Sequence, residues 1–99
     1  MPIAMKVVWR PAALADLSRL ISHIAMDNPS AAARLSRRLR QAAENLPIFP
    51  YKGRVGAIPD TRELVTVQPY IIVYKVVPDE NSLDVLRVWH AAQSRQEVD

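Results

Sequence analysis

The sequence predicts an α+β fold in which a helical hairpin packs on one face of a small, mainly antiparallel sheet. Three observations predict it. Apolar residues recur with helical spacing in the first half, β-branched runs fill the last third, and a stretch rich in proline and glycine separates them. The resulting order of elements is β-α-α-β-β-β. At 99 residues the chain can build one hydrophobic core, so we expect a single domain over residues 1–99.

The first strand and the first helix meet at a proline. Residues 6–10, with the sequence Lys-Val-Val-Trp-Arg, form a short β-type run. Pro11 ends this run, because proline cannot donate to a strand ladder but fits the first turn of a helix. A helix is then expected to about Met26, and its apolar face consists of Leu14, Leu17, Ile21 and Ile24.

A second helix is expected after the break Asp27-Asn28-Pro29, with Asn28 as its N-cap and Pro29 as its first residue. It extends to about Leu46. Its apolar stripe comprises Ala32, Leu35, Leu39, Ala42 and Leu46, and its other face carries Arg34, Arg37, Arg38, Arg40 and Gln41. Two amphipathic helices with so short a link form an antiparallel hairpin.

The second half of the chain contains a loop and a meander. Prolines and glycines dominate residues 47–60, so we expect an irregular connection that displays Lys52 and Arg54. Three strands are expected to follow, over about residues 61–67, 70–77 and 83–90, and short connections make them antiparallel.

Strand parity limits which side chains of the meander can meet, because residues two apart share one face of a strand. Arg62 and Glu63 are therefore expected to point apart. Arg87 and His90 can converge only if the last strand ends or bulges between them. On that strand we expect Leu83, Val85, Arg87 and Trp89 on one side, and Leu86, Val88 and His90 on the other.

Composition excludes several kinds of protein. The chain has no cysteine, which excludes disulfides, a thiol nucleophile and cysteine-ligated zinc, and we expect no metal and no cofactor. No apolar run reaches the roughly 20 residues that cross a bilayer. The N-terminus also lacks the features of a signal peptide, whether Met1 or Met5 is the native start, so we expect a cytoplasmic protein without a membrane partner.

Charge favours an anionic partner without naming its class. The formal net charge is +3, and most of the cationic side chains are arginines. The planar guanidinium group binds carboxylates and phosphates equally well. Charge alone therefore does not choose between an acidic protein and a nucleic acid.

Several short motifs, in this order, resemble the RelE/ParE superfamily of toxins from type II toxin–antitoxin modules. They are Val8-Trp9-Arg10-Pro11-Ala12-Ala13, Asp27-Asn28-Pro29, Pro50-Tyr51-Lys52-Gly53-Arg54, Thr61-Arg62-Glu63-Leu64, Pro69-Tyr70-Ile71-Ile72-Val73-Tyr74 and Val85-Leu86-Arg87-Val88-Trp89-His90. The resemblance covers roughly residues 6 to 95. It implies one of two activities, cleavage of messenger RNA in the ribosomal decoding site or inhibition of DNA gyrase. It also implies a cognate antitoxin, of the dimeric ribbon-helix-helix type, through which the toxin would contact DNA only indirectly.

The chemistry of RNA cleavage tests the first of these activities. Attack by the 2′-hydroxyl needs a base, an acid, and cations for the charge on phosphorus, and Arg62, Arg87 and His90 are the candidates. In the ribonuclease relatives a tyrosine near the C-terminus, or a carboxylate in the loop before the second strand, often completes the site. Here no tyrosine follows Tyr74, and residues 47–59 contain no Asp or Glu. The incomplete set favours a ParE-like toxin that inhibits gyrase by binding.

We expect two groups of contact residues. Lys52, Arg54, Arg62 and Arg87 are expected to contact the target or another anion, and Leu17, Ile21, Leu35, Arg38 and Trp89 to contact the antitoxin. Two alternatives stay open, a ribosome-dependent endoribonuclease that uses Arg62, Arg87 and His90, and a non-toxic interaction module with the same fold. A structural interpretation competes with all of these: Arg62 and Arg87 bond carboxylates, His90 is a hydrogen-bonded strand end, and Trp89 is a core residue.

Overall fold

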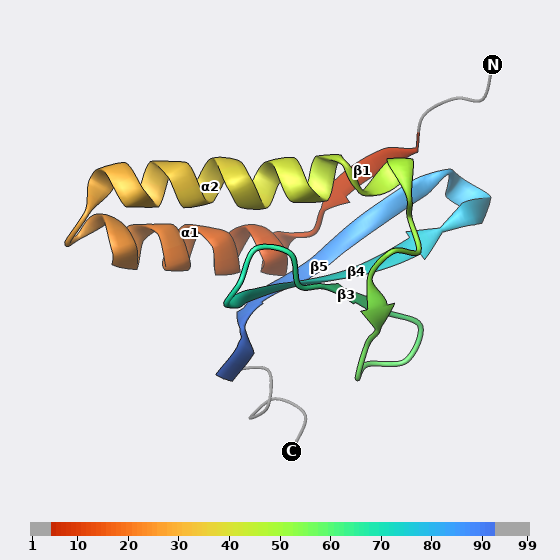
Figure 1. Cartoon of the computed structure of the whole chain (residues 1–99). Helices are drawn as coiled ribbons and strands as arrows, with labels where there is room; N and C mark the ends of the chain where they lie inside the picture. Colours follow the sequence, from red (N-terminus) through yellow and green to blue (C-terminus); the bar gives the residue numbers. More distant parts are fainter. Residues whose placement is uncertain (1–4, 93–99) are drawn as a thin grey trace.

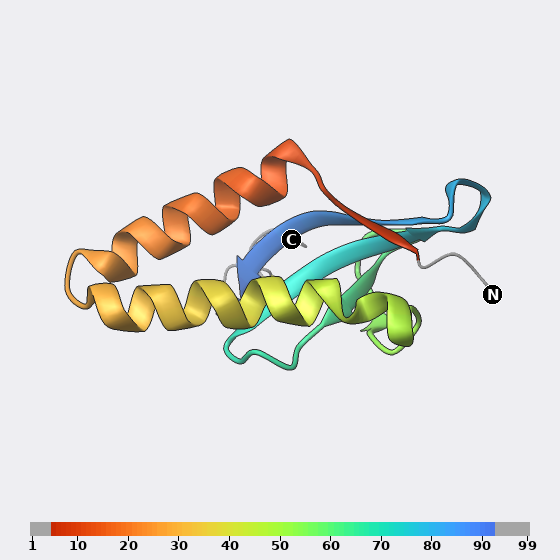
Figure 2. The ribbon, with the colours of Figure 1, turned by 90° about the horizontal axis from the view of Figure 1, so that it is seen from above.

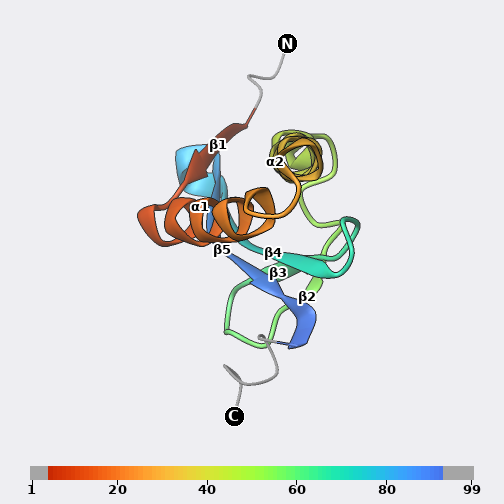
Figure 3. The ribbon, with the colours of Figure 1, turned by 90° about the vertical axis from the view of Figure 1, so that its left-hand side faces the viewer.

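The computed structural model describes residues 5–92, and within that range two helices cover one face of a five-stranded sheet (Figures 1 and 3). The elements are β1 (Lys6–Trp9), α1 (Pro11–Ala25), α2 (Pro29–Glu44), the 3₁₀ turn η1 (Leu46–Ile48), β2 (Arg54–Val55), β3 (Arg62–Leu64), β4 (Tyr70–Val77), the 3₁₀ turn η2 (Pro78–Glu80) and β5 (Ser82–His90). The α+β class and the helical hairpin are confirmed.

The two helices begin where the sequence predicts. Pro11 is the first residue of α1 and Pro29 the first of α2. Asn28 is the N-cap of α2, since its Oδ1 accepts the N–H of Ala31 at 3.0 Å. The helices meet at a short turn and spread apart toward their other ends, so that the strands lie below the gap between them (Figure 2).

The strand order is β1-β5-β4-β3-β2. β1 pairs in parallel with the first half of β5, from Lys6 opposite Ser82 to Trp9 opposite Val85, and the other neighbours are antiparallel. The N–H of Arg10 adds one last bond to the carbonyl oxygen of Val85, at 2.9 Å. Because β1 stops there, the second half of β5 has an open edge beside α1.

Two predictions about the second half of the chain are wrong. Residues 47–60 are not wholly irregular, because Arg54 and Val55 pair with Glu63 and Arg62 to form β2. A strand of two residues is too short to show alternation in a sequence. The strand predicted over residues 61–67 is also shorter, since β3 ends at Leu64 and the chain bends before the turn into β4.

The predicted parity of the last strand is wrong as well. Val73 pairs with Arg87 but Tyr74 pairs with Val85, so Leu86 is an extra residue in β5. Such a bulge moves every later side chain to the opposite face. The helix-facing core therefore contains Leu83, Val85 and Val88, whereas Leu86 and Trp89 pack on the other face with Ile71 and Val73.

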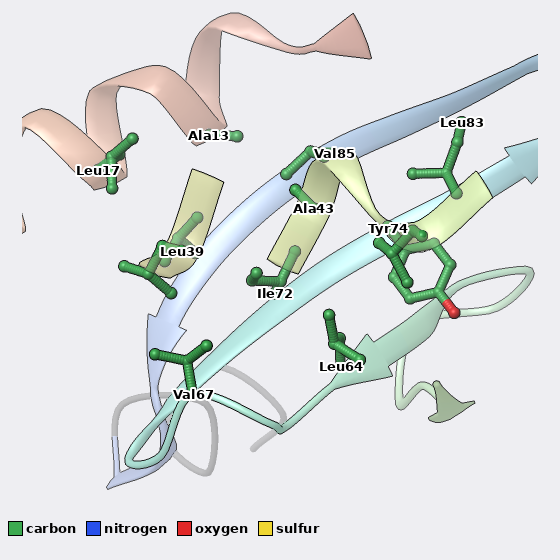
Figure 4. Packing of buried hydrophobic residues seen from close by; sticks show 12 residues of the cluster. Ala13, Leu17, Leu39, Ala43, Leu64, Val67, Ile72, Tyr74, Leu83 and Val85 are labelled. Carbon is green, nitrogen blue, oxygen red and sulfur yellow. The ribbon is translucent and has the colours of Figure 1, made fainter. Parts of the chain in front are cut away.

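The main core lies between the helices and the sheet (Figure 4). Each layer contributes buried side chains: Ala13 and Leu17 from α1, Leu39 and Ala43 from α2, Leu64 from β3, Ile72 and Tyr74 from β4, and Leu83 and Val85 from β5. Ala13 and Ala43 are fully buried, and their small side chains let both helices approach the sheet closely. Neither helix in the described part of the chain is long and apolar enough to cross a membrane.

A buried carboxylate joins α1 to the open edge of β5. Oδ2 of Asp16 accepts the N–H of Val88 at 3.0 Å and Nε–H of Arg87 at 2.7 Å, and its Oδ1 accepts from Nη2 of Arg87 at 3.1 Å. The carboxylate thus occupies the place that a longer β1 would fill with backbone groups. A charged, bidentate pair of this kind is stronger than a neutral hydrogen bond.

Replacement of Asp16 tests this link. We expect Asp16→Ala to lower the free energy of unfolding by about 2–4 kcal/mol, because the buried N–H of Val88 and the guanidinium of Arg87 lose their shared acceptor. Arg19→Ala is the matched control, since Arg19 is 71% exposed and lies 3.9 Å from the same carboxylate. It should cost less than about 1 kcal/mol. Urea unfolding measures both, and equal losses would contradict the assignment.

Candidate functional site

The arginines predicted to contact a target are held by groups of the chain itself. Arg87 is bound to Asp16, and its guanidinium also lies 5.4 Å from the ring centre of Trp89. Arg54 donates to Glu63, with Nε and Nη2 both 2.9 Å from Oε1. For Arg87, the interpretation that the arginine bonds a carboxylate of this chain is confirmed.

Arg62 binds backbone oxygens rather than a carboxylate. Its Nη1 donates to the carbonyl of Tyr51 at 3.0 Å and to that of Gly53 at 2.8 Å, and its guanidinium lies 5.1 Å from the ring centre of Tyr51. Arg62 therefore holds the connection that precedes β2. Arg62 thus binds the segment before the edge strand β2, whereas Arg87 in β5 binds α1. Because β4 lies between β3 and β5, the two arginines are held at different parts of the sheet.

Tyr74 fixes the same connection from inside the core. Its hydroxyl donates to the carbonyl of Pro50 at 2.7 Å and accepts the N–H of Gly53 at 2.9 Å. Burial raises the pKa of Tyr74 above its ordinary value of 10.0, although the hydrogen bond from Gly53 and the charge of Arg62 lower it. A Cβ on Gly53 would lie 2.7 Å from the hydroxyl oxygen, so only glycine fits there. Nothing in the sequence marks this contact, which spans 21 positions.

Lys52 stands at the tip of this fixed connection. Its side chain is exposed, and within residues 5–92 its ammonium group makes no hydrogen bond or ion pair. Of the four cations predicted to contact an anion, Lys52 is the one that the described structure leaves available.

His90 does not join the arginines. It is exposed, its Nδ1 accepts the N–H of Ala92 at 3.1 Å, and its ring meets Tyr70 edge-on at 5.7 Å. The bulge at Leu86 precedes both Arg87 and His90, so it does not bring them to one face. His90 instead borders a hollow of about 290 Å³, which is lined by Asp16, Arg19, Leu20, His23 and Val88. In the described range no three His, Asp or Glu side chains are placed to hold a metal ion.

The residues predicted to bind the antitoxin fall into two groups. Leu17 and Trp89 are buried, the first in the main core and the second in the cluster on the opposite face. Ile21 and Leu35 are half-buried and Arg38 is exposed, so these three remain accessible on the hairpin. Between the helices lies a groove, lined by Leu14, Leu17, Ser18, Ile21, Ser22, Ser36 and Arg40. That Ile21, Leu35 and Arg38 contact an antitoxin stays a prediction.

Comparison with known proteins identifies the family. Residues 7–95 match the family described as ParE toxin of type II toxin-antitoxin system, parDE. The chain therefore belongs to the ParE toxin family, within the RelE/ParE superfamily, and is a toxin of the type II class.

Individual relatives agree with this assignment. The chain is 41% identical to Toxin RelE2 from Caulobacter vibrioides over 88 residues, which cover 89% of this chain and 97% of that protein. It is 38% identical to Y4kP from Sinorhizobium fredii over 94 residues, covering 94% and 95%. Its fold matches a solved chain of the chromosomal ParDE toxin–antitoxin system from P. aeruginosa, with a TM-score of 0.78 at 21% identity over 88% of this chain and 96% of that one.

The Tyr74 hydroxyl is the first contact to test. We expect Tyr74→Phe to lower the free energy of unfolding by about 1–3 kcal/mol, because the buried N–H of Gly53 loses its acceptor. Tyr70→Phe is the control, since Tyr70 is half-buried and its side chain meets His90 through the ring, with no hydrogen bond described for its hydroxyl. Chemical denaturation at neutral pH measures both variants. A loss at Tyr70 as large as that at Tyr74 would refute the role of the hydroxyl.

The raised pKa of Tyr74 gives a separate prediction at alkaline pH. The neutral phenol is the form that the fold favours, so its contribution is complete below pH 10.0 and is lost as pH rises through the folded pKa. The stability advantage of the wild-type protein over Tyr74→Phe should therefore shrink above pH 10. Unfolding curves over the range of about pH 8 to 11, which brackets the ordinary pKa of tyrosine, measure this difference in stability. A difference in stability between the two proteins that stays constant up to about pH 11 would contradict a role for the neutral phenol of Tyr74.

Proposed function

We propose that this toxin is ParE-like and inhibits DNA gyrase by binding it, and that a cognate antitoxin neutralises it. The observation that supports this proposal is the internal engagement of the arginines that an RNA-cleaving site would need. Arg87 is held by Asp16 and Arg62 by the carbonyls of Tyr51 and Gly53.

The chemistry explains why this engagement matters. Cleavage of RNA needs cations already aimed at the phosphate, because stabilisation of developing charge depends on groups that do not reorganise during the reaction. Arg62 donates through Nη1 and Arg87 through Nε and Nη2 to groups of the chain, so these partners, and not a phosphate, orient both guanidinium groups. His90, the acid or base candidate, lies beside Tyr70 and Ala92, and Arg87 does not line the hollow that it borders. A toxin that acts by binding does not need these groups to converge.

A ribosome-dependent mRNA endoribonuclease is the second candidate. The relative with 41% identity carries the name Toxin RelE2, which favours that branch of the superfamily. Lys52 is available for a phosphate, and groups of the ribosome or of the RNA would then supply the missing acid or base.

The antitoxin is proposed to bind across the helical hairpin. The groove between α1 and α2 is lined by three apolar side chains of α1, by three serines and by Arg40. Arg37 and Arg38 lie exposed on α2. An acidic, amphipathic helix suits such a surface, because its apolar face fills the groove while its carboxylates meet the arginines. The P. aeruginosa neighbour comes from a ParDE toxin–antitoxin system. A dimeric ribbon-helix-helix antitoxin would also connect the complex to DNA.

Purified components test the proposed target. With DNA gyrase, relaxed plasmid and ATP, we expect the protein to block supercoiling and to cause gyrase-linked cleaved DNA to accumulate. When the protein is added to ribosomes that translate a defined message, that message should stay intact. Cut messages with unaffected gyrase would refute the proposal and support the endoribonuclease.

Two histidine variants make this test sharper. We expect His90→Ala and His23→Ala to change gyrase inhibition by less than about twofold, because neither imidazole has a chemical role in a binding mechanism. His23 is the matched control, since it is exposed on α1 and borders the same hollow as His90. If His90 were the general acid or base of a ribonuclease, His90→Ala would slow cleavage of the message by about 10²–10⁴-fold, while His23→Ala would cleave it at the wild-type rate.

A further inference from the structure

Large apolar side chains are exposed mainly in one short stretch. Among the described residues seven large hydrophobic side chains are exposed, and five of them belong to residues 48–58. Ile48 and Phe49 are each 68% exposed and Tyr51 is 56% exposed. We use the name knuckle for residues 48–52, which line an open hollow of about 390 Å³. A cluster of exposed apolar groups of this kind marks an interaction site more often than a random surface.

The knuckle lies at a defined place in the molecule. It follows α2 and leads to β2, at the end of the molecule opposite to the turn between α1 and α2 (Figure 1). The groove proposed for the antitoxin shares no lining residue with it. The two surfaces can therefore be changed separately.

The backbone of the knuckle is held in place by hydrogen bonds. The hydroxyl of Tyr74 bonds the carbonyl of Pro50, and Arg62 bonds the carbonyl of Tyr51. The N–H of Lys52 also donates to the carbonyl of Phe49 at 3.1 Å. Apolar side chains on an ordered backbone lose little conformational entropy when they bind, which makes such a segment suitable as an anchor.

The charge beside the knuckle favours a protein partner over a nucleic acid. Lys52 offers one free ammonium group, whereas Arg54 and Arg62 nearby are held by Glu63 and by backbone carbonyls. Binding to a nucleic acid needs several cations on phosphates. One cation beside isoleucine and phenylalanine side chains instead matches an apolar pocket with a carboxylate at its rim.

We propose that the knuckle is the surface by which the toxin anchors itself in an acidic-rimmed, apolar pocket of its protein target. Phe49 is the central anchor and Lys52 pairs with the carboxylate. This inference rests on the proposed function, because it takes the target to be a protein. The knuckle is too small for a whole interface, which covers about 800 Å² on each partner. It corresponds to the few aromatic and charged residues that dominate binding energy in such interfaces.

Two variants and one control test the proposal. Phe49→Ala and Lys52→Glu change the knuckle, while Met26→Ala removes an exposed apolar side chain (83% exposed) at the opposite end of the molecule. Urea unfolding should give all three proteins the same unfolding midpoint as the wild type, because surface changes away from the core usually alter stability little. Binding to the product of the reading frame adjacent to the toxin gene, used as antitoxin, should change by less than about threefold in each.

Target inhibition should separate the variants. We expect Phe49→Ala and Lys52→Glu to need about tenfold more protein to block plasmid supercoiling by gyrase, as truncation of an anchor does. Growth arrest on expression should weaken in parallel, and Met26→Ala should behave as the wild type. Unchanged inhibition by Phe49→Ala would overturn the inference. So would a parallel loss of antitoxin affinity, a change in self-association, or a loss of plasmid binding, since each assigns the knuckle to another occupant.

The same experiment keeps the two proposals apart. If the wild-type protein arrests growth but leaves gyrase active, the proposed function fails, and growth arrest by Phe49→Ala still tests whether the knuckle contacts the target. If the wild type inhibits gyrase and Phe49→Ala inhibits it equally, only the inference about the knuckle fails.

Discussion

The fold depends on one buried carboxylate. Asp16 lies in α1 and bonds Arg87 and the N–H of Val88 in β5, 71 and 72 positions further along the chain. β1 covers only the first half of β5, so without this side chain the remaining edge would expose backbone groups beside a helix. The same contact ties α1 to β5, and it determines where Arg87, the arginine of the last strand, points.

A second set of contacts acts in a similar way at the other side of the sheet. Tyr74 and Arg62 bind the carbonyls and the N–H of residues 50–53, and Glu63 binds Arg54. Three of the four cations predicted to contact an anion, Arg54, Arg62 and Arg87, are thereby held by groups of the chain itself. The surface that these contacts support is the apolar knuckle, with Lys52 beside it. The molecule thus combines internally paired arginines with exposed apolar side chains, a pattern suited to binding more than to acid–base chemistry.

The accuracy of the sequence-based predictions depended on how local each signal was. Pro11, Pro29 and Asn28 act within one turn of their own helices, and their positions were predicted correctly. β2 was missed because two residues carry no periodicity. The bulge at Leu86 was missed because valine, leucine and arginine occur on either face of a strand, so parity alone placed Leu86 and Val88 together.

The sequence by itself determined the class of the fold, the helical hairpin, the meander and the superfamily, because each rests on patterns of neighbouring residues or on motifs in a fixed order. Only the tertiary structure decided what the charged residues do. The partners of Arg87 and Tyr74 lie 71 and 21 positions away and are brought close by the packing of α1 and of the connection before β2 against the sheet. A pairing across such separations leaves no periodic trace in one sequence, so the arginines could be located from it but their partners could not.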